Sequence, residues 1–308
     1  MKIFSGTANL ILAKEVAKYL GRKLSDISIK RFPDCEIWVK INENVRGKDV
    51  FIIQSTSNPV NEHIMELFIM LDAFKRASAR RITAVLPFYS YARQDRKDQP
   101  RVAVTAKLMA NLLTSAGADR ILTMDLHAPH VQGFFDIPVD HLLAEPVITK
   151  YFLKKKIKNL AVVATDMGGV KIARTFAQKL GCNLAIVDKR RSGPHEVKAM
   201  NLIGDVKDKD IVMPDDMIST GGTMVEAAYF LKEKGAREIY ACCTHPILCG
   251  GAVEKLNKAP VREVIVTNTI PLSKEQMSDK IKILSIAPLF AEAIKSIHNE
   301  TSISRLFN

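Results

Sequence analysis

The sequence has no long hydrophobic run and few aromatic residues. Its longest apolar-rich segment, residues 63–74, contains Glu66 and Asp72 and is well short of the ~20 residues that span a bilayer, so we expect no membrane contact. Only 6% of the 308 residues are aromatic, and no basic tail is present. This argues against the aromatic stacking surfaces that hold single-stranded nucleic acid, and we expect no nucleic-acid partner.

Repeats, low-complexity tracts and Cys-x-x-Cys spacings are also missing. A hydrophobic content of 47% excludes a disordered or collagen-like chain. Five cysteines, an odd number without an export signal, favour reduced thiols and a cytoplasmic protein. Cys242, Cys243 and Cys249 could together bind a soft metal ion. Because adjacent cysteines on a strand point to opposite faces, we favour reduced thiols in the core instead.

Basic residues exceed acidic ones. Lys and Arg number 45 against 33 Asp and Glu, which gives a formal net charge of +12. Such a chain attracts anions, and these include nucleic acid, acidic membranes and phosphorylated metabolites. With the first two disfavoured, we expect the charge to serve anionic substrates.

Short β-branched runs alternate with amphipathic stretches along the chain. The pattern predicts strands at residues 49–54, 81–86, 120–124, 160–164, 184–187, 211–213 and 238–244, and helices from 58, at 102–116, 170–180 and 224–234. Such alternation favours mainly parallel sheets flanked by helices on both faces. The length fits two α/β domains, which we place at residues 1–143 and 144–308.

The most informative segment follows the predicted strand at residues 211–213. Two adjacent carboxylates, Asp215 and Asp216, lead into a small polar loop and then an amphipathic helix. The loop residues are Ser219, Thr220, Gly221, Gly222 and Thr223. Backbone N–H groups, hydroxyls and a helix N-terminus together form a cradle for phosphate, while carboxylates accept hydrogen bonds from sugar hydroxyls. The segment therefore suits a sugar phosphate, although an acidic strand end before an ordinary capped helix would look similar.

These residues resemble the phosphoribosyl-pyrophosphate motif of type I phosphoribosyltransferases, and the rest of the chain resembles the ribose-phosphate pyrophosphokinase family. The matching segments are residues 31–36, 89–97, 124–128, 166–169, 188–191 and 284–298. The resemblance implies two type I phosphoribosyltransferase-like domains, usually assembled as a homohexamer. It also implies an active site between the domains that a neighbouring subunit completes.

The resemblance implies transfer of the β,γ-pyrophosphoryl group of Mg-ATP to the C1 hydroxyl of ribose 5-phosphate, giving 5-phosphoribosyl 1-pyrophosphate and AMP. Phosphate and ADP would act as effectors. A base-transferring phosphoribosyltransferase shares the segment from Asp215 to Thr223 but has no use for Arg93 and Gln94. A non-catalytic associated paralogue that regulates active subunits would be expected to have lost catalytic residues, and none is missing.

The resemblance also assigns roles to individual residues. Those implied for ATP binding are Phe32, Asp34, Glu36, Arg93, Gln94 and His127, and those implied for magnesium are His127 and Asp166. Those implied for ribose 5-phosphate are Asp166, Arg191, Asp215, Asp216, Ser219, Thr220, Gly221, Gly222 and Thr223. Lys189 and Arg191 would be catalytic: Lys189 stabilises the transferring phosphates and Arg191 contacts the ribose phosphate. Residues 192–197 would form a mobile flap over the site.

Five positions depart from the family pattern. Cys35 stands where glycine is usual, so we expect a different backbone turn in the adenine loop. Pro214 lacks the amide hydrogen of a central strand, so we expect the strand to end at Met213. Ser219 replaces a common aspartate, and Pro100 and Ala103 alter the loop after Lys97, which leaves phosphate activation and ADP inhibition open.

Overall fold

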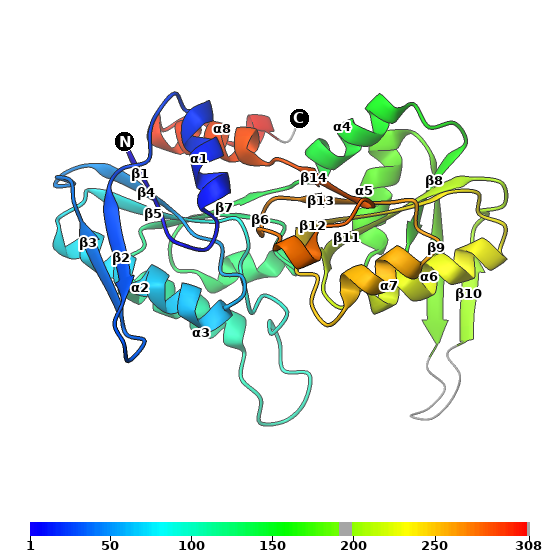
Figure 1. Ribbon diagram of the computed structural model, residues 1–308, viewed down its shortest axis with the longest axis horizontal. Coiled ribbons are helices and arrows are strands. Elements are labelled where there is room, and N and C mark those ends of the chain that lie inside the picture. The colour runs from blue at the N-terminus through cyan, green and yellow to red at the C-terminus, as the bar shows by residue number, and fades with distance from the viewer. Residues whose placement is uncertain (191–198, 307–308) are drawn as a thin grey trace. The chain divides into compact units, whose positions relative to one another are not determined.

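The computed structural model describes residues 1–190 and 199–306, and the chain divides into two compact units (Figure 1). Unit 1 consists of residues 1–143, 269–271 and 285–308. Unit 2 consists of residues 144–268 and 272–284. Arg191 and the flap predicted at residues 192–197 lie outside the described residues.

Unit 1 is built on a five-stranded parallel sheet with the strand order β1-β4-β5-β6-β7. Its strands are β1 (Lys2–Ser5), β4 (Asp49–Ile53), β5 (Arg81–Leu86), β6 (Arg120–Met124) and β7 (Val139–Leu142). Every residue of β4 is buried, as expected for a parallel strand that helices cover on both faces. A separate hairpin, β2 (Ile27–Arg31) and β3 (Ile37–Ile41), packs on α2 (Val60–Arg76).

Helices cover both faces of this sheet (Figure 1). On one face, α2 and α3 (Thr105–Ala116) bury apolar residues against the strands in a single core. On the other face, α1 (Leu10–Tyr19) packs against α8 (Ala287–His298). The 3-10 turns of this unit are η1 (Pro129–Phe134) and η3 (Ser304–Leu306).

Unit 2 is built on a seven-stranded sheet with the strand order β10-β9-β8-β11-β12-β13-β14. Its strands are β8 (Leu160–Ala164), β9 (Asn183–Arg190), β10 (Ala199–Ile203), β11 (Asp210–Ile218), β12 (Ile239–Pro246), β13 (Glu263–Thr267) and β14 (Ile281–Leu284). Neighbouring strands are parallel except for β9 and β10. The carboxyl ends of β8, β9 and β11 therefore meet at one edge of the sheet.

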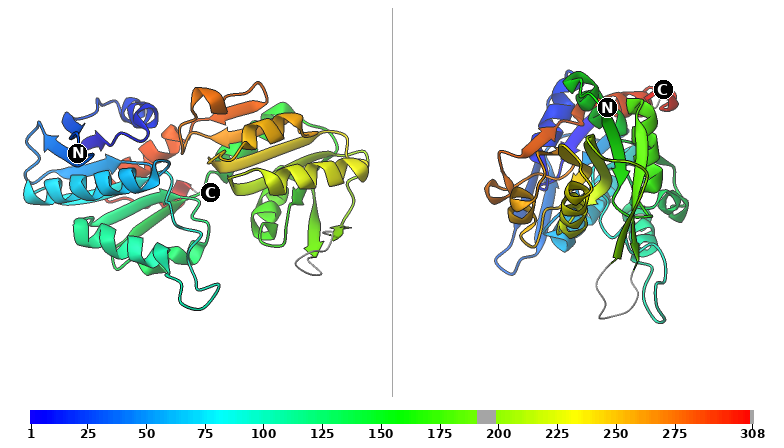
Figure 2. Two further views of the ribbon diagram at one scale, coloured as in Figure 1. Left: turned by 60° about the horizontal axis from the view of Figure 1, so that its bottom comes forward. Right: turned by 90° about the vertical axis from the view of Figure 1, so that its right-hand side faces the viewer.

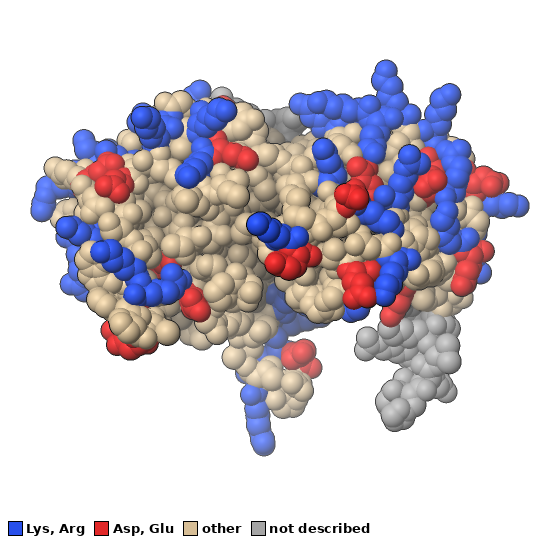
Figure 3. Space-filling model, in the orientation of Figure 1, with Lys and Arg blue, Asp and Glu red and all other residues tan. Residues whose placement is uncertain are grey.

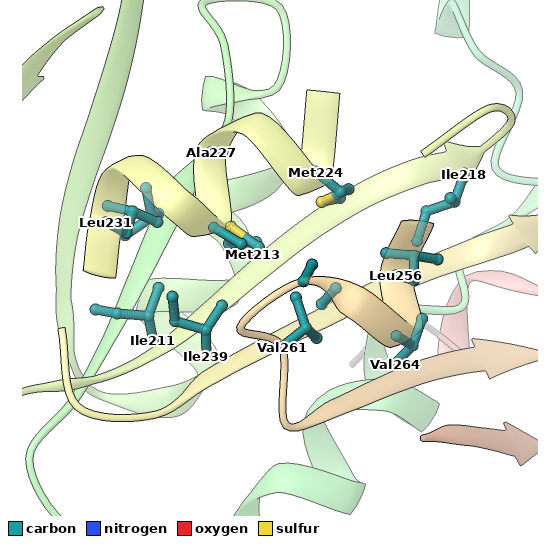
Figure 4. Close-up of a cluster of buried hydrophobic side chains, with 14 of the residues drawn as sticks. Ile211, Met213, Ile218, Met224, Ala227, Leu231, Ile239, Leu256, Val261 and Val264 are labelled. Carbon is teal, nitrogen blue, oxygen red and sulfur yellow. The ribbon is translucent and has the colours of Figure 1, made fainter. Parts of the chain in front are cut away.

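One face of this sheet packs on α6 (Gly222–Glu233) and α7 (Ala252–Lys258), and the other on α4 (Glu145–Lys155) and α5 (Val170–Leu180) (Figure 2). Figure 4 shows the core under α6, where Met224, Ala227 and Leu231 meet Ile211 and Met213 of β11. Alternate residues of β11 supply this core because side chains of a strand alternate between faces. A short 3-10 turn, η2 (Lys274–Gln276), precedes β14.

The fold class predicted from the sequence is confirmed, since each unit is a mainly parallel sheet flanked by helices. The domain expected at residues 144–308 needs a correction, because residues 285–308 belong to unit 1. After β14 ends, the Ser285 hydroxyl donates to the Glu15 carboxylate of α1 at 2.6 Å. The apolar face of α8 is then buried against α1.

The expectation that the strand ends at Met213 is wrong. β11 continues through Pro214 to Ile218, and Pro214 pairs with Cys242 of β12. The ladder from β11 to β8 stops at Val212, so beyond that point the strand is paired on one side. A residue without an amide hydrogen is tolerated there, as it is on an edge strand.

Among the residues that the structure describes, no helix combines the length and hydropathy that crossing a membrane requires.

Candidate functional site

The predicted sugar-phosphate residues of unit 2 lie at the edge where parallel strands end. Asp166 follows β8, and Asp215 and Asp216 lie in the last part of β11. Because β8 and β11 are neighbours and parallel, these three carboxylates come from adjacent strand ends. This is the edge at which open α/β sheets bind ligands.

The loop from Ser219 to Thr223 joins β11 to α6 in the way the sequence predicts. Gly221 has φ +71 and forms the N-terminal cap of α6, a 12-residue helix that starts at Gly222. Glycine adopts this left-handed backbone without the steric penalty of a side chain. The first N–H groups of α6 have no partner within the helix, so the loop presents donors and the positive end of the helix dipole.

The acidic residues beside this loop interact with one another. The Asp216 amide donates to Asp215 Oδ1 at 2.9 Å. Burial raises the pKa of the Asp215 carboxyl, and the nearby Asp216 and Asp166 carboxylates raise it further. A carboxyl pair of this kind retains a proton that a solvated pair would lose, so it can both donate and accept hydrogen bonds.

Asp166 is held in a tight turn before α5. Its Oδ1 accepts a hydrogen bond from the Gly169 amide at 2.9 Å. A Cβ added at Gly168 would lie 3.3 Å from the same oxygen, so this turn has little room for a larger residue. The turn fixes the carboxylate at the end of β8 while the side chain stays partly exposed.

A second loop supports residues 219–223, the predicted phosphate-binding loop, from behind. We call residues 247–251, between β12 and α7, the bracing loop. Its Leu248 and Cys249 amides donate to the Ile218 and Ser219 carbonyls, each at 3.0 Å. The Lys255 ammonium in α7 donates to the Gly250 carbonyl at 3.0 Å and to that of Thr220 at 3.5 Å.

In unit 1, the predicted adenine residues lie in the turn of the β2–β3 hairpin. Phe32 is 49% exposed, and Asp34 and Glu36 are exposed as well. The Phe32 amide donates to the Glu36 carbonyl at 2.8 Å, and the Cys35 amide donates back to Phe32 at 2.9 Å. Cys35 takes the left-handed conformation with φ 71, which glycine adopts most readily, and the difference expected from the family's turn stays a prediction.

The other predicted ATP residues follow the ends of β5 and β6. Arg93 and Gln94 are exposed in the segment between β5 and α3. The Thr105 hydroxyl donates to Gln94 Oε1 at 2.6 Å, and the Ala106 amide donates to the Gln94 carbonyl at 3.1 Å. His127 is exposed just after β6. These residues and the hairpin turn all belong to unit 1.

The predicted metal ligands are divided between the units, with His127 in unit 1 and Asp166 in unit 2. Within residues 1–190 and 199–306, no group of three or more His, Cys, Asp and Glu side chains is arranged to hold a metal ion. Magnesium often binds through one or two carboxylates together with substrate phosphates and water. The donor set, with Asp166 as its oxygen ligand, fits a magnesium ion that arrives on ATP.

The predicted catalytic residues follow the strand next to β8. Lys189 lies in β9, where its backbone pairs with Met200 of β10. The strand is longer than the predicted residues 184–187, since it continues to Arg190. Parallel pairing with β8 places the end of β9 at the same edge as Asp166.

Basic side chains gather on part of the surface. On the face drawn in Figure 3, Lys and Arg outnumber acidic residues near α4. The exposed lysines at the end of that helix are Lys154, Lys155, Lys156 and Lys158. These lysines lie in the last turn of α4 or just after it, outside the predicted substrate loops, so the net charge is not concentrated at the predicted site alone.

The cysteines occupy two environments. Cys242 and Cys243 are fully buried in β12, and burial raises the pKa of each thiol. Both are core thiols, as predicted. Cys249 is exposed, so the expectation that it lies in the core with them is wrong.

Sequence reasoning missed a buried polar network at the ends of β1 and β4. The Glu66 carboxylate is fully buried and accepts from the Thr7 amide and hydroxyl, both at 2.7 Å, and from Gln54 Nε2 at 2.8 Å. It also missed the bracing loop. The polar network and the bracing loop each bring together residues that lie far apart in the sequence. Only the glycine pair Gly250 and Gly251 indicated an unusual backbone in the bracing loop.

Comparison with known proteins agrees with this geometry. Residues 1–117 match the family model described as the N-terminal domain of ribose phosphate pyrophosphokinase. Residues 190–308 match the model of the phosphoribosyl synthetase-associated domain.

Individual relatives match over nearly the whole length. The ribose-phosphate pyrophosphokinase of Caldanaerobacter subterraneus subsp. tengcongensis is 55% identical, covering 100% of this chain and 98% of the relative. That of Bacillus caldolyticus is 51% identical, again covering 100% and 98%. A crystal structure of phosphoribosylpyrophosphate synthetase from Mycobacterium smegmatis superposes with a TM-score of 0.93 at 42% identity, covering 97% of this chain and 99% of that one. The resemblance inferred from the sequence is thus confirmed, and the chain belongs to the ribose-phosphate pyrophosphokinase family.

Proposed function

We propose that the protein transfers the β,γ-pyrophosphoryl group of Mg-ATP to the C1 hydroxyl of ribose 5-phosphate. The C1 oxygen forms a bond to the β-phosphorus, and the bond from that phosphorus to the oxygen bridging to the α-phosphate breaks. AMP leaves with the bridging oxygen, and the hydroxyl proton is released. The product is 5-phosphoribosyl 1-pyrophosphate, a precursor for nucleotide biosynthesis.

The observation that carries this proposal is the arrangement at the end of β11. The carboxyls of Asp215 and Asp216 directly precede a glycine-containing loop and the N-terminus of α6. The loop suits the 5-phosphate of the sugar, and the carboxyl pair suits neighbouring ribose hydroxyls, which both donate and accept hydrogen bonds. Thr220 and Thr223 are exposed on this loop.

The ATP residues are proposed in unit 1. Phe32 has an exposed ring that is suited to stacking on adenine. Asp34 and Glu36 are exposed as well, and their carboxylates can accept hydrogen bonds from the amino group of adenine. Arg93 suits the phosphates, because a guanidinium pairs with phosphate oxygens in a bidentate way. Gln94 is fixed by its bond from Thr105 and so can orient a bound nucleotide.

Magnesium is proposed to arrive with ATP and to be contacted by Asp166 and His127. When bound, it neutralises charge on the phosphate oxygens and aligns them for transfer. The Gly169 amide holds the Asp166 carboxylate at a fixed place beside the sugar site. Histidine is an uncommon partner for so hard a cation, so the proposed role of His127 rests on the family resemblance.

Lys189 and Arg191 are proposed as the catalytic cations. Pyrophosphoryl transfer develops charge on oxygens in line with the reacting phosphorus, and preorganised cations stabilise that charge. Lys189 lies near the end of β9, which runs parallel to the strand that Asp166 follows, and Arg191 is assigned by resemblance to the ribose phosphate. Family members usually assemble as hexamers, and we extend both this assembly and phosphate and ADP regulation to the chain as proposals.

The alternative of a non-catalytic regulatory paralogue is not favoured. Every predicted catalytic and binding residue is present in the sequence, and the chain matches enzymes of the family at 51–55% identity over its full length. A base-transferring phosphoribosyltransferase is disfavoured as well, because unit 1 matches the N-terminal domain of the pyrophosphokinases.

The test is incubation of the purified protein with ATP, ribose 5-phosphate and magnesium, followed by separation of the nucleotides. AMP should form in proportion to consumed ribose 5-phosphate and should disappear when either the sugar or the divalent cation is withheld. Stoichiometric ADP, or turnover that EDTA leaves undiminished, would contradict the proposal.

A further inference from the structure

We propose that Cys249 is a positioning residue for the phosphate-binding loop. Its thiol lies 3.3 Å from the Ser219 hydroxyl and would set the direction of that hydroxyl's hydrogen. The proposal rests on the function argued above, because it takes residues 219–223 as the site of ribose 5-phosphate. It adds a residue outside the phosphate-binding loop that tunes the affinity for the sugar.

The bracing loop is bonded to the end of β11 and to the first residue of the phosphate-binding loop. The Leu248 amide donates to the Ile218 carbonyl and the Cys249 amide donates to the Ser219 carbonyl, so the two backbones stay hydrogen-bonded beyond the end of the β11–β12 ladder. The backbone of Ser219 is therefore fixed from the bracing side. The Ser219 side chain can still rotate about its Cα–Cβ bond, and the contact between its hydroxyl and Cys249 Sγ restricts this rotation.

The chemistry of the ligand sets the direction of the hydrogen bond. At neutral pH phosphate oxygens mainly accept hydrogen bonds, so a serine hydroxyl that binds phosphate must donate its hydrogen. A hydroxyl has one hydrogen and two lone pairs, and a thiol can act as a weak donor. When the substrate is bound, the hydrogen between Ser219 and Cys249 must then come from the thiol. Cys249 would thereby hold the Ser219 oxygen in place without competing for the phosphate.

The environment of Cys249 argues against a purely structural role. Cys242 and Cys243 of the adjoining strand are fully buried and contribute to packing, whereas Cys249 is exposed. Removing an exposed thiol leaves no cavity, so it should change stability little. An effect on sugar binding would then report the bond to Ser219.

The experiment compares Cys249→Ala and Cys249→Ser in the full chain, with ribose 5-phosphate binding measured by titration calorimetry. The loss of one weak hydrogen bond should raise the Kd for ribose 5-phosphate roughly 2- to 10-fold in Cys249→Ala. Cys249→Ser keeps a donor and should stay within about twofold of wild type. In steady-state assays the KM for ribose 5-phosphate should follow the Kd, while kcat and the KM for ATP stay nearly constant.

A double-mutant cycle with Ser219→Ala tests whether the effect passes through Ser219. Once the hydroxyl is absent, Cys249→Ala should weaken binding by less than about twofold further. Cys182→Ala is the matched control, since Cys182 is partly exposed in the same unit and precedes the amino end of β9. It should bind ribose 5-phosphate as the wild type does.

Three outcomes would overturn the inference: wild-type binding by Cys249→Ala, equal loss in Cys249→Ala and Cys249→Ser, or independent effects of the two sites in the cycle. A lower melting temperature of Cys249→Ala with unchanged sugar affinity would likewise assign the thiol a structural role and refute the proposal. Failure of the proposed function looks different. There the wild-type protein forms no AMP, whereas the calorimetric comparison among variants still reports on Cys249.

Discussion

Gly221 and Gly222 allow the phosphate-binding loop to be tested with two neighbouring substitutions. Gly221 has φ +71, while Gly222 is the first residue of α6 and has no such backbone. Neither site is closed to a methyl group, because an added Cβ would lie 3.6 Å from the Ala252 Cβ at Gly221 and 3.9 Å from Thr220 Oγ1 at Gly222. The two alanine variants therefore differ mainly in backbone conformation.

The expected difference in stability follows from that conformation. Replacing glycine by alanine restricts the unfolded chain and stabilises the fold by about 0.4–1 kcal/mol wherever alanine fits. This contribution is common to both variants and cancels when they are compared. The remainder is the penalty of alanine in the left-handed region, about 1–2 kcal/mol. Gly221→Ala should thus be less stable than Gly222→Ala by about 1–2 kcal/mol.

Urea unfolding of both variants measures this difference, and calorimetric titration with ribose 5-phosphate measures the function of the loop. We expect Gly222→Ala to be at least as stable as the wild type and yet to bind the sugar phosphate more weakly, because a methyl group hinders the approach of phosphate to the backbone. Equal stability of the two variants would refute the assigned backbone. Wild-type affinity in Gly222→Ala would refute the close approach of phosphate.

Three further predictions concern the acidic pair, the catalytic lysine and self-association. Burial raises the pKa of Asp215 above its ordinary value of 3.8, so the folded protein keeps a proton that the unfolded chain has lost, and stability falls as pH rises through this interval. Asp215→Asn lacks this titration. It should therefore gain stability relative to wild type as the pH rises from the ordinary pKa of 3.8 to the raised pKa of about 8, at about 1.4 kcal/mol per unit of pKa shift. A pH-independent difference in urea unfolding would contradict this. Lys189→Ala should lower kcat roughly 10²- to 10³-fold with little change in ATP affinity, whereas near-normal kcat in a steady-state assay would remove Lys189 from the transition state. Sedimentation at micromolar concentration should show an assembly larger than a monomer, and a single 34.3 kDa species would count against self-association.

Local patterns predicted several elements well. Hydrophobic periodicity predicts the observed bounds of β5, β6, β8 and α5. In each of these elements, the local pattern of apolar residues alone indicates which residues are buried. The succession of strand, loop and helix around residues 219–223 was predicted for a similar reason, because its glycines, hydroxyls and carboxylates are contiguous. The binding of a sugar phosphate by this loop stays a prediction.

Features that depend on distant contacts could not be predicted in this way. The placement of α8 in unit 1 depends on its packing against α1, far away in the sequence. The extension of β11 through Pro214 depends on where β8 stops pairing. The bracing loop is similar, since nothing in the sequence near Ser219 indicates that Cys249 is its neighbour.

The central claim is that the C1 oxygen of ribose 5-phosphate attacks the β-phosphorus of ATP, and NMR of a reaction with ribose 5-phosphate carrying ¹³C at C1 tests it most directly. The account predicts that the C1 carbon becomes coupled to phosphorus, that this phosphorus is itself coupled to a second one in a pyrophosphate, and that AMP accumulates in equal amount. A C1 carbon coupled to a single, isolated phosphate, with ADP as the nucleotide product, would contradict it.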